Sequence, residues 1–192
     1  MGLIYTTAGK AGFITGLYVV IVPILGLLWH NKTSAGTWIG AFMAAVGLYL
    51  LSINESFIIS YGDFLELICA FCFALHVIVV DKLIKKMDTL TLATLQSLFC
   101  SLASLVVALI RETVELQNIM DAAIPILYSG FVSVGIAYSL QIYGQKGSHP
   151  ANAAIILSLE SVIAALSGWL ILSEIMSIRG LTGCAIMLSG MM

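Results

Sequence analysis

Seven long runs of apolar residues, separated by short connections, dominate the sequence. A helix needs about 20 mostly apolar residues to cross about 30 Å of membrane hydrocarbon. The runs are too long and too uniformly apolar for the strands of a membrane barrel, which alternate polar with apolar residues. We therefore predict an all-α, polytopic bundle of transmembrane helices at Ala11–Trp29, Gly36–Ile53, Phe64–Val80, Leu90–Ile110, Ala122–Ile142, His149–Leu172 and Ile178–Met192.

The shortage of charged residues supports this prediction and excludes several classes of protein. Of the 192 residues, 60% are hydrophobic and 9% are charged. A soluble domain has about 25% charged residues, because its surface faces water. The chain has no basic stripe of the kind that binds nucleic acid, and too much apolar mass for a disordered protein. We expect a lipid bilayer around the chain and no nucleic-acid partner. The longest connection, Arg111 to Asp121, has eleven residues, so no soluble domain fits between the runs.

The cationic residues predict an orientation, because Lys and Arg concentrate in cytoplasmic loops. We name the side of the N-terminus X and the other side Y. Side Y holds Lys32, Lys82, Lys85, Lys86 and Lys146, and side X holds Lys10, Arg111 and Arg179. Seven acidic residues near side X, Glu66 and Glu174 among them, agree with this asymmetry. Side Y is therefore predicted to be cytoplasmic.

The sequence contains no catalytic motif and no set of residues with metal-ligand spacing. Cys69, Cys72, Cys100 and Cys184 all lie in apolar runs, where cysteine packs as a small hydrophobe. Cys69 and Cys72 have the spacing of a redox or zinc motif, but a second such pair and nearby histidine ligands are missing. We find no G-x-S-x-G, H-E-x-x-H or P-loop sequence. We therefore expect no enzyme activity, no cofactor and no metal. An intramembrane enzyme is the least favoured interpretation of the chain.

Two parts of the sequence are weakly similar to each other. Residues Gly9–Leu28 align with Ala151–Leu170 at an offset of 142, and five of the 20 pairs are identical. These pairs are Ala11/Ala153, Ile14/Ile156, Leu17/Leu159, Gly26/Gly168 and Leu28/Leu170. In the next run the offset becomes 143 and pairs Gly40 with Gly183 and Gly47 with Gly190. Five predicted spans separate the two starts, so the second copy enters the membrane from the opposite side, as in many secondary transporters.

Two motifs resemble a known family. The residues Thr6-Thr7-Ala8-Gly9-Lys10-Ala11-Gly12-Phe13-Ile14-Thr15, leading to Pro23, look like the fourth helix of EamA proteins in the drug/metabolite transporter superfamily. Gly168-Trp169-Leu170-Ile171-Leu172-Ser173-Glu174, followed by Gly183 and Gly190, resembles the family's ninth and tenth helices. The family has two inverted halves of five helices each. The resemblance implies that residues 1–53 are the last two helices of the first repeat and that residues 54–192 are the second repeat.

The resemblance also implies a function. It predicts a multi-pass secondary transporter, in the inner membrane of a bacterial cell, that moves a small metabolite or drug-like solute by alternating access, usually outward. The resemblance is compatible with a homodimer. Because the chain resembles helices four to ten, we expect Met1 to be an internal methionine of a longer reading frame. The alternative is a truncated, inactive or partner-dependent membrane protein without independent transport.

Glu160 is the sharpest candidate for a functional residue. It lies eleven residues past His149, or about 16 Å along a helix, near the middle of the bilayer. A carboxylate at this depth is costly unless it is protonated, paired or in contact with water. We consider two interpretations, a group that binds a proton or a cationic substrate and a protonated residue that packs between helices.

Other polar residues of the predicted spans are weaker candidates. Lys10 is expected either to extend toward the headgroups or to meet an anionic group, and His76 either to relay protons or to pack between helices. Tyr18, Asn152 and Ser158 are expected to line a cavity or to hydrogen-bond between helices, as are Gln96, Gln141, Tyr138 and Ser161. The residues predicted to permit close packing or gating are Pro23, Gly40, Gly47, Gly183 and Gly190.

Overall fold

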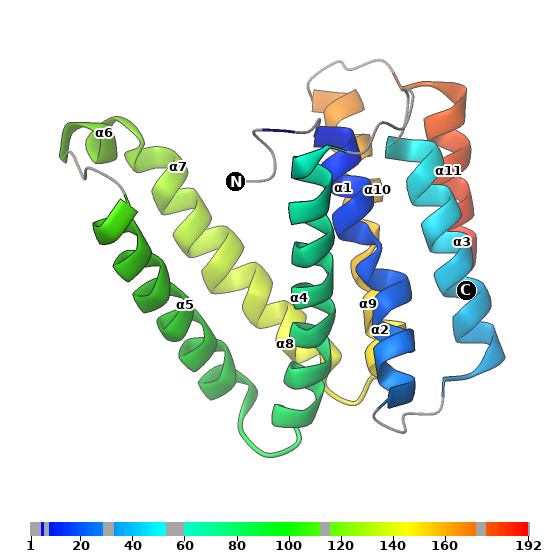
Figure 1. Cartoon of the computed structure of the whole chain (residues 1–192), viewed down its shortest axis with the longest axis horizontal. Coiled ribbons are helices and arrows are strands. Elements are labelled where there is room, and N and C mark those ends of the chain that lie inside the picture. Colours follow the sequence, from blue (N-terminus) through cyan, green and yellow to red (C-terminus); the bar gives the residue numbers. More distant parts are fainter. Residues whose placement is uncertain are drawn as a thin grey trace. The chain divides into compact units, whose positions relative to one another are not determined.

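The computed structural model describes residues 5, 8–28, 33–52, 60–111, 116–171 and 176–191, and the regular structure in these ranges is entirely helical (Figure 1). The chain forms two compact units. The first comprises Met1–Val79 and His149–Met192, and the second comprises Val80–Ser148. The prediction of an all-α bundle is therefore confirmed.

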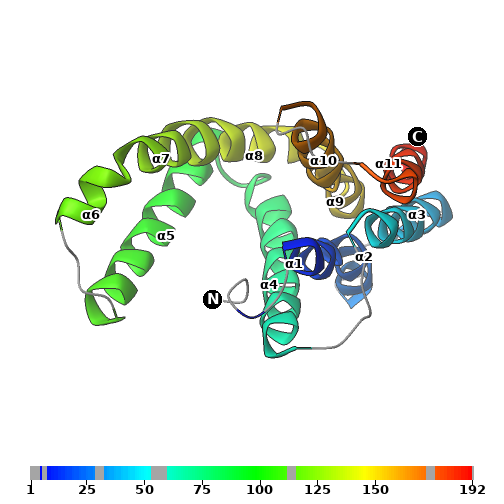
Figure 2. The same cartoon turned by 90° about the horizontal axis from the view of Figure 1, so that it is seen from above.

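The first unit contains both ends of the described chain. Its helices are α1 (Ala8–Gly16), α2 (Tyr18–Leu28), α3 (Ala35–Ser52), most of α4 (Tyr61–Leu83), α9 (Pro150–Leu157), α10 (Leu159–Ile171) and α11 (Ile178–Gly190). Helices far apart in sequence pack together, since α2 contacts α9 and α3 contacts α11. Both views show α3 beside α11 (Figures 1 and 2).

The second unit is a helical hairpin that follows the end of α4. It contains α5 (Thr89–Arg111), α6 (Leu116–Asp121), α7 (Ala123–Tyr128), the π-helix η2 (Ser129–Tyr138) and α8 (Ser139–Gln145). The short helix α6 lies in a segment that we predicted to be a loop. An apolar cluster of Val80, Ile84, Leu92, Ala93 and Ile142 holds α5 and α8 to the end of α4.

Among the residues that the structure describes, six helical segments are long and apolar enough to cross a membrane, and they coincide with the first six predicted runs. They are Lys10–Leu28, Ala35–Ser52, Tyr61–Leu83, Thr89–Arg111, Ala123–Gln145 and Pro150–Ile171. The seventh run forms α11, which has 13 residues and is shorter than a full span. Large apolar side chains such as Phe99, Ile124 and Phe131 are exposed, as expected of surfaces that contact lipid.

Two of the six spans are interrupted near their middle. The first breaks at Leu17, where the amide of Leu17 donates to the Ile14 carbonyl and the amide of Val20 donates to the Leu17 carbonyl. The second breaks at Ser158, whose hydroxyl donates to the Ile155 carbonyl at 2.6 Å. These bonds span three residues, which tightens and bends the helix. Helix α2 itself continues through Pro23.

The backbones of α3 and α11 approach each other closely at two pairs of glycines, Gly40 with Gly190 and Gly47 with Gly183. A Cβ atom at Gly40 would collide with the carbonyl oxygen of Gly190. A Cβ atom at Gly47 would lie 2.5 Å from the carbonyl oxygen of Gly183. A larger residue at either place would therefore force the helices apart, as expected of small residues at membrane helix interfaces.

Candidate functional site

Polar groups of the first unit gather around the break between α1 and α2. Thr15, two residues before the break, donates its hydroxyl proton to Oε2 of Glu66 on α4 at 3.0 Å. Both side chains are partly buried. This bond supplies one of the acceptor sites of the Glu66 carboxylate with a donor from another span.

Tyr18, one residue after the break, extends the polar region in two directions. Its ring is 8% exposed and packs edge-on against Phe73 of α4, with 4.8 Å between the ring centroids. Phe73 in turn lies 5.8 Å from the ring of His76. The carboxylate of Glu160 on α10 lies close enough to the Tyr18 hydroxyl to interact with it electrostatically.

We name the set of Thr15, Tyr18, Glu66, His76 and Glu160 the carboxylate site. Three separate spans contribute to it, and its residues come from α1, α2, α4 and α10. Glu66 and His76 are ten residues apart on α4, or about 15 Å along the helix, so the carboxylate site is an extended band of groups. Each of its carboxylates and its imidazole can bind a proton on its own. Tyr18 offers a hydroxyl that both donates and accepts hydrogen bonds.

Thr15 and Glu66 are the members of the carboxylate site that we did not predict. Thr15 entered only as part of the first family motif, and we treated Glu66 as one of the acidic residues near side X. The spacing of residues in α4 could have indicated Glu66. Glu66, Phe73 and His76 are separated by seven and three residues, so they share one face of α4. The same periodicity places Cys69 near Glu66.

The structure places the remaining polar candidates in other surroundings. Lys10 lies in the first turns of α1. The Ser158 hydroxyl is 3% exposed and is used at the break of its own span. Asn152 on α9 accepts a hydrogen bond from Thr37 on α3 at 2.9 Å. Gln96, Gln141 and Tyr138 belong to the second unit, whereas Ser161 belongs to α10 in the first.

The gating candidates lie in the packed parts of the first unit. Pro23 is buried in α2, and the four predicted glycines form the two contacts between α3 and α11. Cys184 packs in an apolar cluster with Leu48, Val162 and Met187. Within the described ranges, no three His, Cys, Asp or Glu side chains form a group that would hold a metal. All four cysteines are free thiols. Lys32 and Glu174 lie outside the described residues.

The chain is similar to known membrane transporters. Residues 60–192 match the EamA-like transporter family. The chain is also 33% identical over 178 residues to an uncharacterized transporter of Archaeoglobus fulgidus. That alignment covers 92% of this chain and 57% of the relative, so the chain spans a little over half of the relative's length. With six helices able to span a bilayer and a family match over more than half of its residues, this multi-pass membrane protein belongs to the EamA-like transporter family.

Proposed function

We propose that this chain is the working part of a secondary transporter that moves a small solute by alternating access and couples the movement to a proton or a cation at Glu160. The observation that carries the proposal is the position of Glu160. In a chain of a transporter family, this carboxylate lies two residues past the interruption at Ser158 of its own span. It is also within electrostatic range of Tyr18, which lies one residue past the interruption at Leu17 of another span.

Interrupted helices suit this role for a physical reason. In transporters, helices broken near the middle of the membrane direct backbone groups and helix ends at bound ions or substrate. Here the Leu17 amide bonds across three residues and the Ser158 amide is shared between the Ala154 and Ile155 carbonyls, so the regular helical bonding changes at both places. A carboxylate at the same depth is stable when it is protonated or when it holds a cation. Exchange between these two states provides a means of coupling solute movement to an ion gradient.

The pattern of helix starts supports an inverted repeat. Helices α1 and α9 begin at Ala8 and Pro150, 142 residues apart, and α3 and α11 begin at Ala35 and Ile178, 143 residues apart. These are the two offsets that align the sequence with itself. The residues before α3 and α11, Ser34 and Ser177, are also 143 apart, and each accepts a hydrogen bond from the backbone amide three residues later.

The packing of the first unit supports the same relation. The offsets convert the contact of Gly40 with Gly190 into the contact of Gly183 with Gly47, and both contacts are present. Adding or subtracting the same offsets also relates five residues of one apolar cluster to five residues of another. The pairs are Val20/Val162, Ala41/Cys184, Ala44/Met187, Phe13/Ile155 and Leu48/Met191. We propose that residues 1–53 and 54–192 belong to two inverted repeats.

The repeat gives Glu160 a special position. The offset of 142 pairs Glu160 with Tyr18, and the carboxylate of Glu160 lies within electrostatic range of the Tyr18 hydroxyl. The midpoint between two equivalent residues lies on the two-fold axis that relates the copies. In an inverted repeat this axis lies in the membrane plane, where transporters bind substrates and coupling ions.

We further propose outward transport, a homodimer, the absence of enzyme activity and a bacterial inner membrane. The relative from an archaeon does not favour a bacterial source.

The proposed coupling role is tested with the purified chain in proteoliposomes. A panel of amino acids, nucleosides and cationic drugs is offered with and without a pH gradient, and accumulation inside the vesicles is measured. We expect the gradient to drive accumulation of at least one solute by the wild-type chain. Glu160→Gln is expected to abolish gradient-driven accumulation, because the amide cannot exchange a proton, whereas Glu160→Asp retains it in part.

Ser189→Ala is the matched control, because the Ser189 hydroxyl only donates to the Ala185 carbonyl within α11. Full accumulation by Glu160→Gln would disprove the coupling role. If the wild-type chain transports no solute in the panel, the result favours the alternative of a truncated, inactive or partner-dependent protein.

A further inference from the structure

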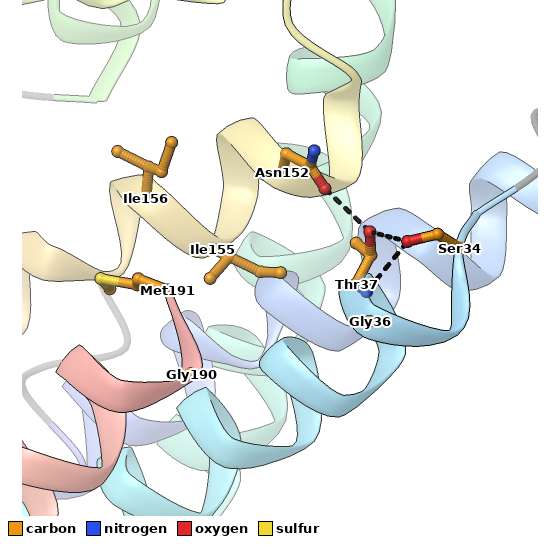
Figure 3. A pocket seen from close by; sticks show the side chains of 8 residues that line it. All are labelled: Ser34, Gly36, Thr37, Asn152, Ile155, Ile156, Gly190 and Met191. Carbon is orange, nitrogen blue, oxygen red and sulfur yellow. Dashed lines mark hydrogen bonds between the residues drawn. The ribbon is translucent and has the colours of Figure 1, made fainter.

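A second polar site lies in the first unit, about 12 Å along the α9–α10 span from Glu160, at the start of α9. A cavity of about 300 Å³ is bounded there by α3, α9 and the end of α11 (Figure 3). This volume is at the lower end of the range of small-molecule sites. The residues that line it are Ser34, Gly36, Thr37, Asn152, Ile155, Ile156, Gly190 and Met191.

A chain of hydrogen bonds fixes the polar edge of the cavity. The Thr37 hydroxyl donates to Oδ1 of Asn152 at 2.9 Å, and the hydroxyls of Thr37 and Ser34 are also 2.9 Å apart (Figure 3). A hydroxyl has a single proton to donate. Because Thr37 gives its proton to Asn152, the bond between the two hydroxyls must be donated by Ser34.

The direction of these bonds determines what the cavity offers a ligand. Ser34 and Thr37 have used their protons within the chain of bonds, and Ser34 also accepts from the Thr37 amide at 3.2 Å. The Asn152 side-chain nitrogen carries two N–H donors, and it has no hydrogen-bond partner within the described part of the chain. Asn152 is exposed, so these donors are reachable. Among these three side chains, the Asn152 amide therefore holds the protons that are still free to be donated, and two adjacent N–H groups suit a ligand with oxygen acceptors.

The opposite side of the cavity is apolar. Ile155, Ile156 and Met191 line it, and Gly190 adds no side chain. A ligand that satisfies both sides has an oxygen-rich head and a hydrocarbon body. We propose that this cavity binds a small amphiphile through a carboxylate or phosphate head held by the Asn152 amide. Such a head comes from a solute in the water phase or from a bilayer lipid, and this inference goes beyond the proposed function because it concerns binding outside the carboxylate site.

Binding is measured by the fluorescence of Trp38, which directly follows Thr37. The other two tryptophans are replaced (Trp29→Phe and Trp169→Phe) in the purified full chain in detergent. Octanoate is the probe for a water-soluble carboxylate, dioctanoyl phosphatidate is the probe for a lipid phosphate, and octylammonium is the control with the same hydrocarbon chain. We expect a saturable change with octanoate, with dioctanoyl phosphatidate or with both, and none with octylammonium.

Two substitutions at Asn152 make the test specific. Asn152→Leu keeps the approximate size and removes the donors, so it is expected to weaken binding of the acidic probe by about tenfold or more. Asn152→Asp replaces the donors with a negative charge and is expected to reverse the preference, so that octylammonium binds instead. That gain of binding also demonstrates that the variant is folded.

The relative affinities of octanoate and the phosphatidate identify the source of the ligand. Equal binding of octanoate and octylammonium to the wild-type chain would overturn the inference. An unchanged affinity in Asn152→Leu, or the lack of any saturable signal, would do so too. The measurement needs no transport, so its outcome is independent of the test at Glu160.

Discussion

At the scale of single residues, the structure joins polar groups that the sequence holds far apart. Thr15 and Glu66 are 51 positions apart and form one hydrogen bond. A hydrogen bond to a charged group contributes about 1.5–3 kcal/mol, and its loss is costly when the charged group is partly buried. The Thr15 hydroxyl therefore has a structural role in holding the Glu66 carboxylate against α1.

The bond between Thr15 and Glu66 is tested with a double-mutant cycle. Thr15→Val keeps the shape of the side chain and removes the donor, so we expect it to lower the free energy of unfolding by about 1–2 kcal/mol. In a Glu66→Gln background the same change should have a smaller effect, because an uncharged amide binds the hydroxyl less strongly. The free energies are measured by reversible denaturant titration in mixed micelles. Equal effects of Thr15→Val in both backgrounds would contradict the bond.

At the scale of helices, the pairing of α3 with α11 depends on the absence of side chains at the glycines. A Cβ atom at Gly47 would lie 2.5 Å from both the Gly183 oxygen and the side chain of Met187. Backbone oxygen atoms cannot move aside as the end of a flexible side chain can. The glycines therefore permit the helices to approach one another, and their mutual contacts agree with the proposed repeat.

Gly47→Ala is expected to destabilise the protein by about 1–3 kcal/mol, because an added methyl group overpacks the contact with α11. Gly12→Ala is the matched control, since nothing lies within 4 Å of a Cβ atom at Gly12. In that helix alanine should be neutral or stabilise by up to about 1 kcal/mol. Thermal unfolding in detergent micelles compares the two proteins. A Gly47→Ala protein as stable as Gly12→Ala would show that the helices separate without cost.

At the scale of the whole molecule, the six spans and their exposed apolar faces require a bilayer, and the remaining question is orientation. The Lys82, Lys85 and Lys86 cluster follows the third span and favours a cytoplasmic location for that connection. Lys85 also forms an ion pair with Asp81 at 2.9 Å, and Asp81 is almost fully buried. Lys82 and Lys86 add to the positive charge of the same end.

The orientation is tested with single cysteines in a background from which Cys69, Cys72, Cys100 and Cys184 have been removed. Met87→Cys lies in the connection on side Y and Gln117→Cys lies in α6 on side X. In intact cells a membrane-impermeant maleimide should label Gln117→Cys, and it should label Met87→Cys only after permeabilisation. The reverse pattern would invert the topology, and labelling of both sites from outside would contradict the span count.

The sequence by itself determined the class of fold, six of the seven predicted spans and the family, because bilayer thickness fixes how long an apolar run must be and charge is excluded from it. It also drew attention to Glu160 and to the glycines at offset 143. Only the tertiary structure decided that Glu66 bonds to Thr15, that Tyr18 lies within electrostatic range of Glu160, and that Asn152 and Thr37 border a cavity. These contacts join helices that are far apart in the chain. A span that is apolar on all sides has no sequence pattern to show which of its faces contacts a neighbouring helix, so tertiary packing decides the contacts. The helix breaks at Leu17 and Ser158 also arise from local bonding that hydropathy does not record.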